Sequence, residues 1–491
     1  MRNIINLQQN LFNPSMLNFE INLNSRDEIP KLLIGLQHIL KTVELRDEVL
    51  KILEEVIPAN INRNTGRPGM DIWQIFVLGS LRLNCSWDFD KTAEIANEHR
   101  TVRRMLGHDE NDFQKKYPVQ TIADNVTLLT PEIMDRINQA VCNYGHKLVG
   151  KKAEELRGNC DSFVVETDVH FPTDINLLFD AMVKVIIIIA VICDALGITN
   201  WRQHNYNLKK IKKLFTRAMK LKPSTSKNDA KKEERAQIIK EAYQAYLDLA
   251  ESFLVKVLTT ITEIKTMGTD IIIDIKLNAL NTFIAHAQRQ IDQVRRRVME
   301  GEIIPHDEKV FSIFEEHTEW ICKGKAGVPQ ELGLKVCILK DQFGFILYHH
   351  VMEKQTDDKA AVPMVKEAKK RFDKLNGCSF DKGFYTPDNK KELKEILDLL
   401  VMPKKGKLSE ADKEEEHSEE FLNARRKHSV VESSINALEN HGLDRCRDHG
   451  LHGFKRYVAL AVLARNIQII GHMIQQKELN KQRQRKLADR S

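Results

Sequence analysis

The sequence lacks the marks of a secreted protein. Its eight cysteines are scattered without a CxxC pair, and no N-terminal stretch carries the apolar core of a signal peptide. A disulfide-rich secreted fold would need cysteines at regular spacing, so that class of protein is not indicated. We expect a protein of the reducing cytoplasm.

Long hydrophobic runs are missing as well. The most apolar segment, VIIIIAVIC at 185–193, is nine residues long and lies between Lys184 and Asp194. A helix needs roughly 20 apolar residues to cross a bilayer. We therefore predict a buried helix or strand here and no association with a membrane.

The sequence also lacks a large excess of charge of one sign. The 75 Lys and Arg residues nearly balance the 69 Asp and Glu residues, which leaves a net charge of +6 over 491 residues. A DNA-binding surface is compatible with this balance only if the two signs are separated in space. The length predicts two or three units, each with its own core.

Helical patterns dominate the first part of the chain. Leucines and isoleucines recur every three or four residues in IPKLLIGLQHILKTVELRDEVLKILEEVI, and residues 1–150 are predicted to be an all-α region. Within it, SWDFDKTAEIANEHRTVRRMLG predicts two short helices, the second carrying Arg103 and Arg104. They form either a helix-turn-helix that binds phosphates or two packed helices of a bundle.

The spacing of the apolar residues changes from a helical to a strand pattern at residue 161, which marks a second domain. DSFVVETDVHF, from residue 161, has polar residues between apolar ones, as a partly buried strand does. Residues 174–308 return to a helical pattern and are predicted to be an all-α insertion between the first and second strands. The domain that contains the strands is predicted to comprise 151–173 and 309–475, followed by a basic tail at 476–491.

The elements after the insertion follow a regular order. GLKVCILKD and GFILYHHVME predict an antiparallel hairpin. DKAAVPMVKEAKKRFDKLNG predicts a helix closed by Gly377, and CSFD a strand before a helix capped by Thr386 with Pro387 at its first position. DLLVMP predicts a further strand, and FLNARRKHSVVESSINALEN predicts one long amphipathic helix.

This order brings three acids together. A strand, a hairpin, a crossover helix and a further strand place the first and fourth strands side by side, in a mixed sheet of five strands. Asp161 opens the first strand, Asp381 ends the fourth, and Glu432 lies in the helix that must pack on the same sheet. Each acid considered alone has an ordinary interpretation. Asp161 would be an acid at the start of a strand, Asp381 a turn residue and Glu432 a solvated helix residue. Their order along the fold favours a shared site.

Converging carboxylates are typical ligands of Mg²⁺ or Mn²⁺. Two such ions about 3.5–4 Å apart can activate a water or a 3′-hydroxyl on one side of a phosphodiester and stabilise the leaving oxygen on the other. We therefore predict a site for two ions held by Asp161, Asp381 and Glu432.

The same segments resemble a known family. DSFVVETDVHFPTD, SFDKGFYTPDN and ARRKHSVVESSINALENHGLDRCRDHGLHGFKRYVALAVLARN are similar to the three catalytic blocks of DDE-type insertion-sequence transposases, most closely the ISNCY group, over residues 70–475. The resemblance implies a ribonuclease H-like core that nicks transposon ends and joins the 3′-hydroxyl to target DNA. It also implies DNA as the partner, in a homo-oligomeric synaptic complex on a prokaryotic nucleoid. For residues 1–150 it implies a role in binding DNA ends or forming multimers, and for 151–173 with 309–475 it implies the catalytic core.

The resemblance assigns the site residues by position. The family's first aspartate falls on Asp161, with Phe163 where threonine is usual, and its second aspartate and its glutamate fall on Asp381 and Glu432. Asp168 is the alternative for the first aspartate, in the opposite phase of the same strand.

Basic residues near these blocks are candidates for DNA contacts. Related families place an arginine before the glutamate and a lysine seven residues after it; here Arg426 precedes Glu432, Glu439 replaces the lysine, and Arg445 is a possible substitute. Solvated basic faces are the alternative interpretation. The candidates for phosphate contacts are Arg426, His428, Lys323, Lys325, Arg445, Arg103 and Arg104.

A cluster of histidines allows a second metal hypothesis. His441, Cys446, His449 and His452 lie in HGLDRCRDHGLHG, and such side chains at short spacing can bind zinc. Their spacing matches no common zinc module, and a tight loop whose histidines cap helices or contact DNA is the alternative.

The sequence as a whole predicts a DNA transposase with metal-dependent cleavage and strand-transfer activity. Two alternatives stay open: a catalytically decayed DNA-binding protein of the same fold, and a nuclease without strand transfer.

Overall fold

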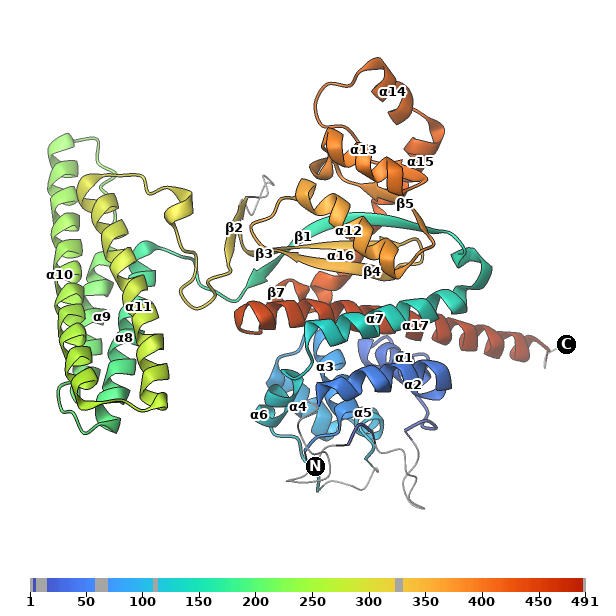
Figure 1. The fold of residues 1–491 in the computed structure, drawn as a ribbon, viewed down its shortest axis with the longest axis horizontal. Coiled ribbons are helices and arrows are strands. Elements are labelled where there is room, and N and C mark those ends of the chain that lie inside the picture. Colours follow the sequence, from blue (N-terminus) through green and yellow to red (C-terminus); the bar gives the residue numbers. More distant parts are fainter. Residues whose placement is uncertain (1–2, 6–15, 58–68, 109–113, 323–329, 489–491) are drawn as a thin grey trace. The chain divides into compact units, whose positions relative to one another are not determined.

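The computed structural model describes residues 3–5, 16–57, 69–108, 114–322 and 330–488. The chain forms two compact units (Figure 1). The first combines residues 1–168 with 319–491 and contains the sheet, and the second, residues 169–318, is helical.

A mixed sheet of seven strands lies in the first unit. Its order is β2-β3-β1-β5-β6, with β4 paired to β3 and β7 paired to β1. β1 is antiparallel to β3 and parallel to β5, so the predicted first and fourth strands are neighbours. The strands are β1 (Leu156–Thr167), β2 (Glu319–Cys322), β3 (Gln330–Asp341), β4 (Ile346–Met352), β5 (Leu375–Phe380), β6 (Leu399–Val401) and β7 (Arg445–Cys446).

The mixed sheet is confirmed, and the prediction of five strands is wrong. β1 and β3 are each 12 residues long and extend beyond their main partners. The short β2 pairs with residues 330–333 of β3, and the two-residue β7 pairs with 166–167 of β1. These short strands satisfy main-chain groups that would otherwise lie unpaired at a sheet edge.

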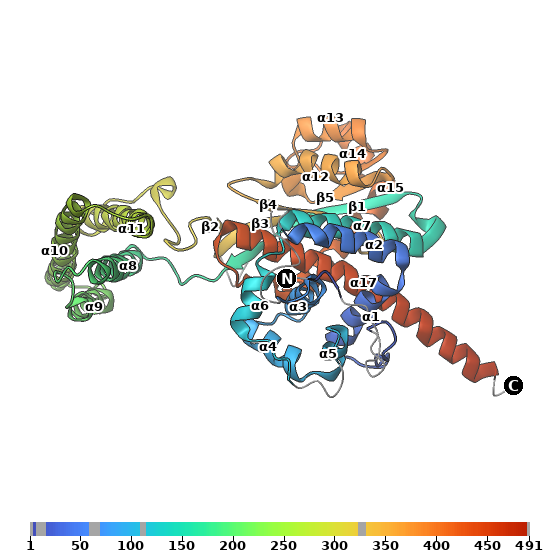
Figure 2. The ribbon, with the colours of Figure 1, turned by 60° about the horizontal axis from the view of Figure 1, so that its bottom comes forward.

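Helices cover both faces of this sheet. Figure 2 shows α12 and α13 on one side of it and α7 and α17 on the other. The helices of the first unit are α1 (Glu28–Lys41), α2 (Val43–Leu53), α3 (Ile72–Asn84), α4 (Phe89–Glu98), α5 (Arg100–Met105), α6 (Val119–Val126), α7 (Pro131–Val149), α12 (Asp357–Arg371), α13 (Pro387–Ile396), α14 (Glu410–Glu416), α15 (Glu419–His428), α16 (Val430–Leu438) and α17 (Gly450–Ala488).

The N-terminal helices share one core with the sheet. α17 packs against α1, α3 and α7, and a single cluster of buried apolar side chains extends from these helices through the strands. α7 approaches the hairpin closely at Gly145, where a Cβ would collide with the ring of Phe345. Residue 150 is therefore no boundary between two separate cores, and the predicted tail continues α17 as far as Ala488.

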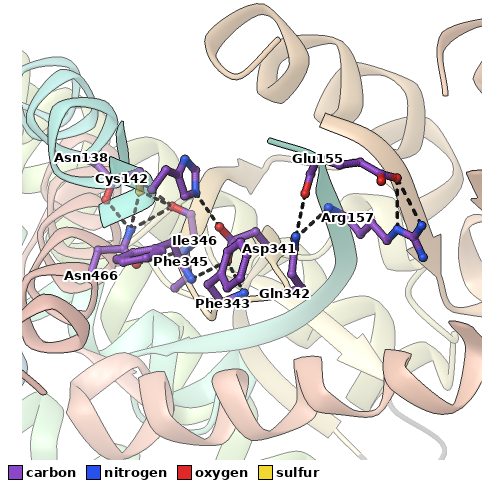
Figure 3. Close-up of polar contacts among 11 residues, drawn as sticks. Asn138, Cys142, Glu155, Arg157, Asp341, Gln342, Phe343, Phe345, Ile346 and Asn466 are labelled. Carbon is purple, nitrogen blue, oxygen red and sulfur yellow. Dashed lines mark hydrogen bonds and ion pairs between the residues drawn. The ribbon is translucent and has the colours of Figure 1, made fainter. Parts of the chain in front are cut away.

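A buried acid anchors the β3–β4 hairpin to these helices (Figure 3). Asp341 is 0% exposed, accepts a hydrogen bond from the Phe345 N–H (2.9 Å), and lies 2.6 Å from Nε2 of His146 in α7. Nearby, Asn466 of α17 donates to the Ile346 carbonyl (2.9 Å). The hairpin is thus held by polar contacts to two helices that are distant from it in sequence.

The predicted long helix over 421–440 is broken at Ser429 into α15 and α16. The Ser429 hydroxyl donates to the Arg426 carbonyl (2.9 Å), which a continuous helix would use for the Val430 N–H. In addition, the Lys340 ammonium of β3 donates to the Val430 carbonyl (2.9 Å) and the Ser434 hydroxyl (3.0 Å). These contacts fix the start of α16 against the sheet.

The preceding crossover helix is shorter than predicted. α12 ends at Arg371, six residues before Gly377, because Phe372 turns into the core and β5 begins at Leu375. Gly377 lies inside β5, where its lack of a side chain lets β6 approach.

The second unit consists of four helices: α8 (Asp174–Ala195), α9 (His204–Lys220), α10 (Asp229–Met267) and α11 (Ile271–Arg295). α8 packs against α9 and α11, and α10 against α9, around a core of its own. The predicted apolar run is part of α8, which is 22 residues long. By length and composition, α8 and α17 could each cross a bilayer, and 50% and 72% of their apolar windows are buried.

Candidate active site

The edge of β1 is open over part of its length. β5 pairs with β1 as far as Cys160, and β7 pairs with it from Glu166. Between these points no strand in the described part of the chain lies beside this edge. A cavity of about 610 Å³ opens there, and the consecutive residues 161–164 line it. An open strand edge can be reached from both faces, which explains why adjacent residues line one space.

The three predicted acids line this cavity. Asp161 comes from the open edge of β1, Asp381 directly follows β5, and Glu432 lies in the first turn of α16. The parallel register pairs Cys160 with Phe380, so the two aspartates occupy equivalent positions on adjacent strands. Asp161 is half-buried, whereas Asp381 and Glu432 are exposed.

The turn after β5 leaves the Asp381 carboxylate available. An aspartate before a helical turn commonly caps that turn with its side chain, but Asp381 makes no capping hydrogen bond to the 3₁₀ turn Lys382–Phe384. The next helix is capped by Thr386, whose hydroxyl accepts from the Asn389 N–H (3.1 Å), with Pro387 at its first position as predicted.

Electrostatics distinguish Asp161 from an ordinary surface acid. Burial, and to a lesser extent the charges of Asp381, Asp357 and Glu432, together raise the pKa of its carboxyl to about 6. A hydrogen bond of 2.7 Å from the Ser162 N–H opposes this change. The cavity therefore concentrates negative charge that a bound cation would compensate.

Two lining residues were not predicted. Asp357, the first residue of α12, accepts hydrogen bonds from the Ser162 hydroxyl (2.7 Å) and from Lys335 Nζ (2.9 Å). Lys335, in β3, is the only Lys or Arg among the described residues that line the cavity. Acids in a first helical turn are common because they interact favourably with the helix dipole, so no feature of the sequence singled out Asp357.

His428 lies inside the protein beside the acids. Its Nδ1 is 2.9 Å from the Ser379 hydroxyl, which accepts from the Asn159 amide (2.7 Å). Burial lowers the pKa of His428, while the charges of Asp381 and Glu432 oppose that effect. His428 is therefore half-buried near the cavity rather than part of an exposed basic surface, whereas Arg426 is exposed on α15.

Asp168 does not share the cavity. It is exposed and lines a separate cavity with Arg445, whose guanidinium lies 3.5 Å from Asp168 and 3.3 Å from Glu166. The placement of the side chains favours Asp161 over Asp168 as the partner of Asp381.

Arg103 is a structural residue. It is 6% exposed and donates to the carbonyls of Asn97 and Lys115, both at 3.3 Å. These contacts tie α5 to neighbouring loops and leave little of the side chain exposed for the predicted contact with DNA. Arg104 is half-buried. Lys323 and Lys325 lie outside the described residues.

The zinc hypothesis finds no support in the geometry. His441 Nδ1 contacts the Asn84 carbonyl, and the buried thiol of Cys446 contacts the Asp448 carbonyl at 3.5 Å. Among the described residues, no three or more His, Cys, Asp or Glu side chains are grouped closely enough to hold a metal ion. This includes the acids of the cavity, which line the space as separate side chains.

The donors of the cavity nevertheless fit a hard divalent cation. They are carboxylate oxygens, which Mg²⁺ and Mn²⁺ prefer. Burial is the main cause of the raised pKa of Asp161, and the negative charges of Asp381, Asp357 and Glu432 add to it.

Asp161 lies inside β1, which begins at Leu156, so the prediction that it opens the strand is wrong, whereas Asp381 directly follows β5 as predicted. Residues 299–467 match the family of the transposase DDE domain, which supports a DDE-type transposase and implies a ribonuclease H-like fold for this segment. The matched segment contains Asp381 and Glu432, and Asp161 precedes it. Neither a curated protein nor a solved structure matches the chain. The assignment to the ISNCY group stays a prediction.

Proposed function

We propose that this protein is a DNA transposase that cleaves transposon ends and transfers the freed 3′-hydroxyl to target DNA. One observation carries the proposal: Asp161, Asp381 and Glu432, from three distant segments of the chain, line one cavity at a sheet edge. The transposase DDE domain over 299–467 supplies the substrate class, DNA.

Asp161, Asp381 and Glu432 would hold the divalent ions that the family uses. When bound, such ions supply activation of the attacking oxygen and stabilisation of the leaving oxygen. The Ser162 N–H orients the Asp161 carboxylate. Asp357 holds the Lys335 ammonium at the cavity, where it can bind a phosphate oxygen.

Both proposed steps are in-line displacements at phosphorus. In the first, a water oxygen attacks and the bond to the 3′-oxygen breaks, which leaves a 3′-hydroxyl and a 5′-phosphate. In the second, that 3′-hydroxyl attacks a target phosphodiester and displaces another 3′-oxygen. The exposure of Asp381 and Glu432 supports a site that admits a polymer without opening a lid.

The test uses the full-length protein, Mg²⁺ or Mn²⁺, and labelled DNA carrying the ends that flank its own gene. The wild type should give cleaved and joined products on a denaturing gel. Asp381→Asn should abolish both products and retain DNA binding, whereas Asp168→Asn, outside the cavity, should keep both activities.

Unchanged products with Asp381→Asn would contradict the assigned site. A wild type that binds without cleaving would favour a catalytically decayed protein, and one that cleaves without joining would favour a nuclease.

A further inference from the structure

The helical unit contains a segment of one charge. Residues 195–228 include nine Lys and Arg residues and no Asp or Glu. The rest of the chain mixes both signs, with 75 basic and 69 acidic residues overall. Most of this segment is α9, a helix of 17 residues, which is roughly 25 Å long at 1.5 Å per residue.

The basic side chains of α9 occupy one side of the helix. Lys209, Lys213, Arg217 and Lys220 follow a spacing of four, four and three residues, which forms a single stripe at 3.6 residues per turn. All four are exposed, as are Lys210 and Lys212 beside them. We call these six residues the α9 basic stripe.

The opposite side of α9 is used for packing. Ile211 and Ala218 are buried in the core of the helical unit, and Phe215 stacks on Phe179 of α8 with ring centroids 4.4 Å apart. Tyr206, 65% exposed, lies on the same side as the basic stripe. The charged side chains of α9 are thus exposed, while its apolar side is already covered.

No acid among the residues that the structure describes neutralises the stripe. None of its six members forms an ion pair in the described part of the chain. By contrast, Arg296, near the end of α11, lies 2.6 Å from Glu302 and 2.7 Å from Glu308. Unpaired like charges on one helix repel one another, and a polyanion would remove that repulsion.

We infer that the α9 basic stripe binds the phosphate backbone of duplex DNA. The inference rests on the proposed function for the identity of the polyanion. Regularly spaced cations with an exposed tyrosine among them suit phosphates and sugars. An anionic membrane is less well matched, because membrane-surface helices bury their apolar side in lipid, and that side of α9 packs against the helical unit.

The test measures how salt weakens DNA binding. Fluorescence anisotropy with a labelled duplex and full-length protein in EDTA gives the slope of log affinity against log salt, independently of cleavage. Lys209, Lys213, Arg217 and Lys220 are replaced together by Gln. Since each lost phosphate contact removes about 0.9 from the slope, the loss of four contacts should make the variant's slope smaller by about 3.6. Circular dichroism confirms that the helices remain.

A matched control removes the same charge elsewhere in the helical unit. Lys231, Lys265, Lys276 and Arg289 lie on α10 and α11 and form no ion pair in the described structure. Their joint replacement by Gln should change the slope by less than one. Equal slopes for the two variants, or a stripe variant with the wild-type slope, would overturn the inference.

A parallel measurement uses vesicles of phosphatidylserine and phosphatidylcholine. Loss of vesicle binding with unchanged DNA binding in the stripe variant would overturn the inference in favour of a membrane. Failure of the proposed function is distinguishable, because a wild type that binds DNA through the stripe without cleaving it leaves this inference standing.

Discussion

Two aspartates of the same sheet have opposite environments. Asp341 is fully buried, and its oxygens accept from the N–H groups of Phe343 and Phe345 and contact His146. Asp161 is half-buried beside other acids, and burial and their charges raise its pKa to about 6. A buried acid with all its partners stabilises a fold, whereas an acid placed among other acids is typical of a functional site.

Removing the charge of Asp161 should have the largest effect. Asp161→Asn takes away one of the proposed metal ligands, and ligand sites of this kind contribute several kcal/mol to transition-state stabilisation. We expect cleavage to fall roughly a thousandfold or more. Thermal stability should not fall, because the substitution relieves repulsion among the acids. Timed cleavage assays measure the activity, and melting curves on the same preparations measure the stability. If Asp161→Asn is active or clearly less stable than the wild type, Asp161 is not the functional acid that the contrast with Asp341 describes.

Removing Asp341 should produce the reverse result. Asp341→Ala leaves two buried N–H groups and His146 without their acceptor, which we expect to lower the free energy of unfolding by about 3 kcal/mol. Urea denaturation measures this change. Asp373→Ala, at an exposed aspartate near the end of α12, is the control and should cost less than about 0.5 kcal/mol. Equal stability of the two variants would show that Asp341 is not an anchor.

Lys335 offers a finer test of the cavity. Lys335→Met should lower cleavage by roughly 10- to 100-fold, because a charge-assisted hydrogen bond to phosphate contributes about 1.5–3 kcal/mol. Lys335→Arg should restore part of the activity. A neutral methylphosphonate at the cleavage site should weaken binding by the wild type more than binding by Lys335→Met. Equal weakening in both would show that Lys335 only balances the charge of Asp357.

The pH dependence of stability should show the smallest effect. The pKa of Asp161 is about 6 in the folded protein and about 3.9 when unfolded, so the folded protein holds an extra proton between these values. The resulting stability is complete below about pH 4 and is lost as pH rises through about 6. In EDTA, the wild type should lose about 1–2 kcal/mol over this window relative to Asp161→Asn. If the stability of the wild type and that of Asp161→Asn change in parallel over this pH window, the raised pKa of Asp161 is contradicted.

Local patterns predicted much of the fold. The antiparallel hairpin of β3 and β4, the Thr386 cap and the position of Asp381 after a strand depend on neighbouring residues, and the structure has each of them. The break at Ser429 was not predictable, because it depends on contacts with Lys340, which lies 90 residues away along the chain from Val430.

Part of the candidate site could not be predicted, because the sequence does not show which side chains are buried. Arg103 and His428 look like surface residues in basic segments, but the packing places Arg103 against two carbonyls and His428 against Ser379. Asp357 reaches the cavity only because α12 crosses the sheet beside β1. Such positions follow from tertiary packing, which no short pattern in the sequence encodes.

The most direct test of the central claim is a crystal of the protein with Mn²⁺ and DNA ends, measured at the manganese absorption edge. If the open edge of β1 is a metal-dependent site, anomalous density should lie in contact with Asp161, Asp381 and Glu432. Density at Asp168 and Glu166 instead, or none beside the three acids in a protein that cleaves DNA, would contradict it.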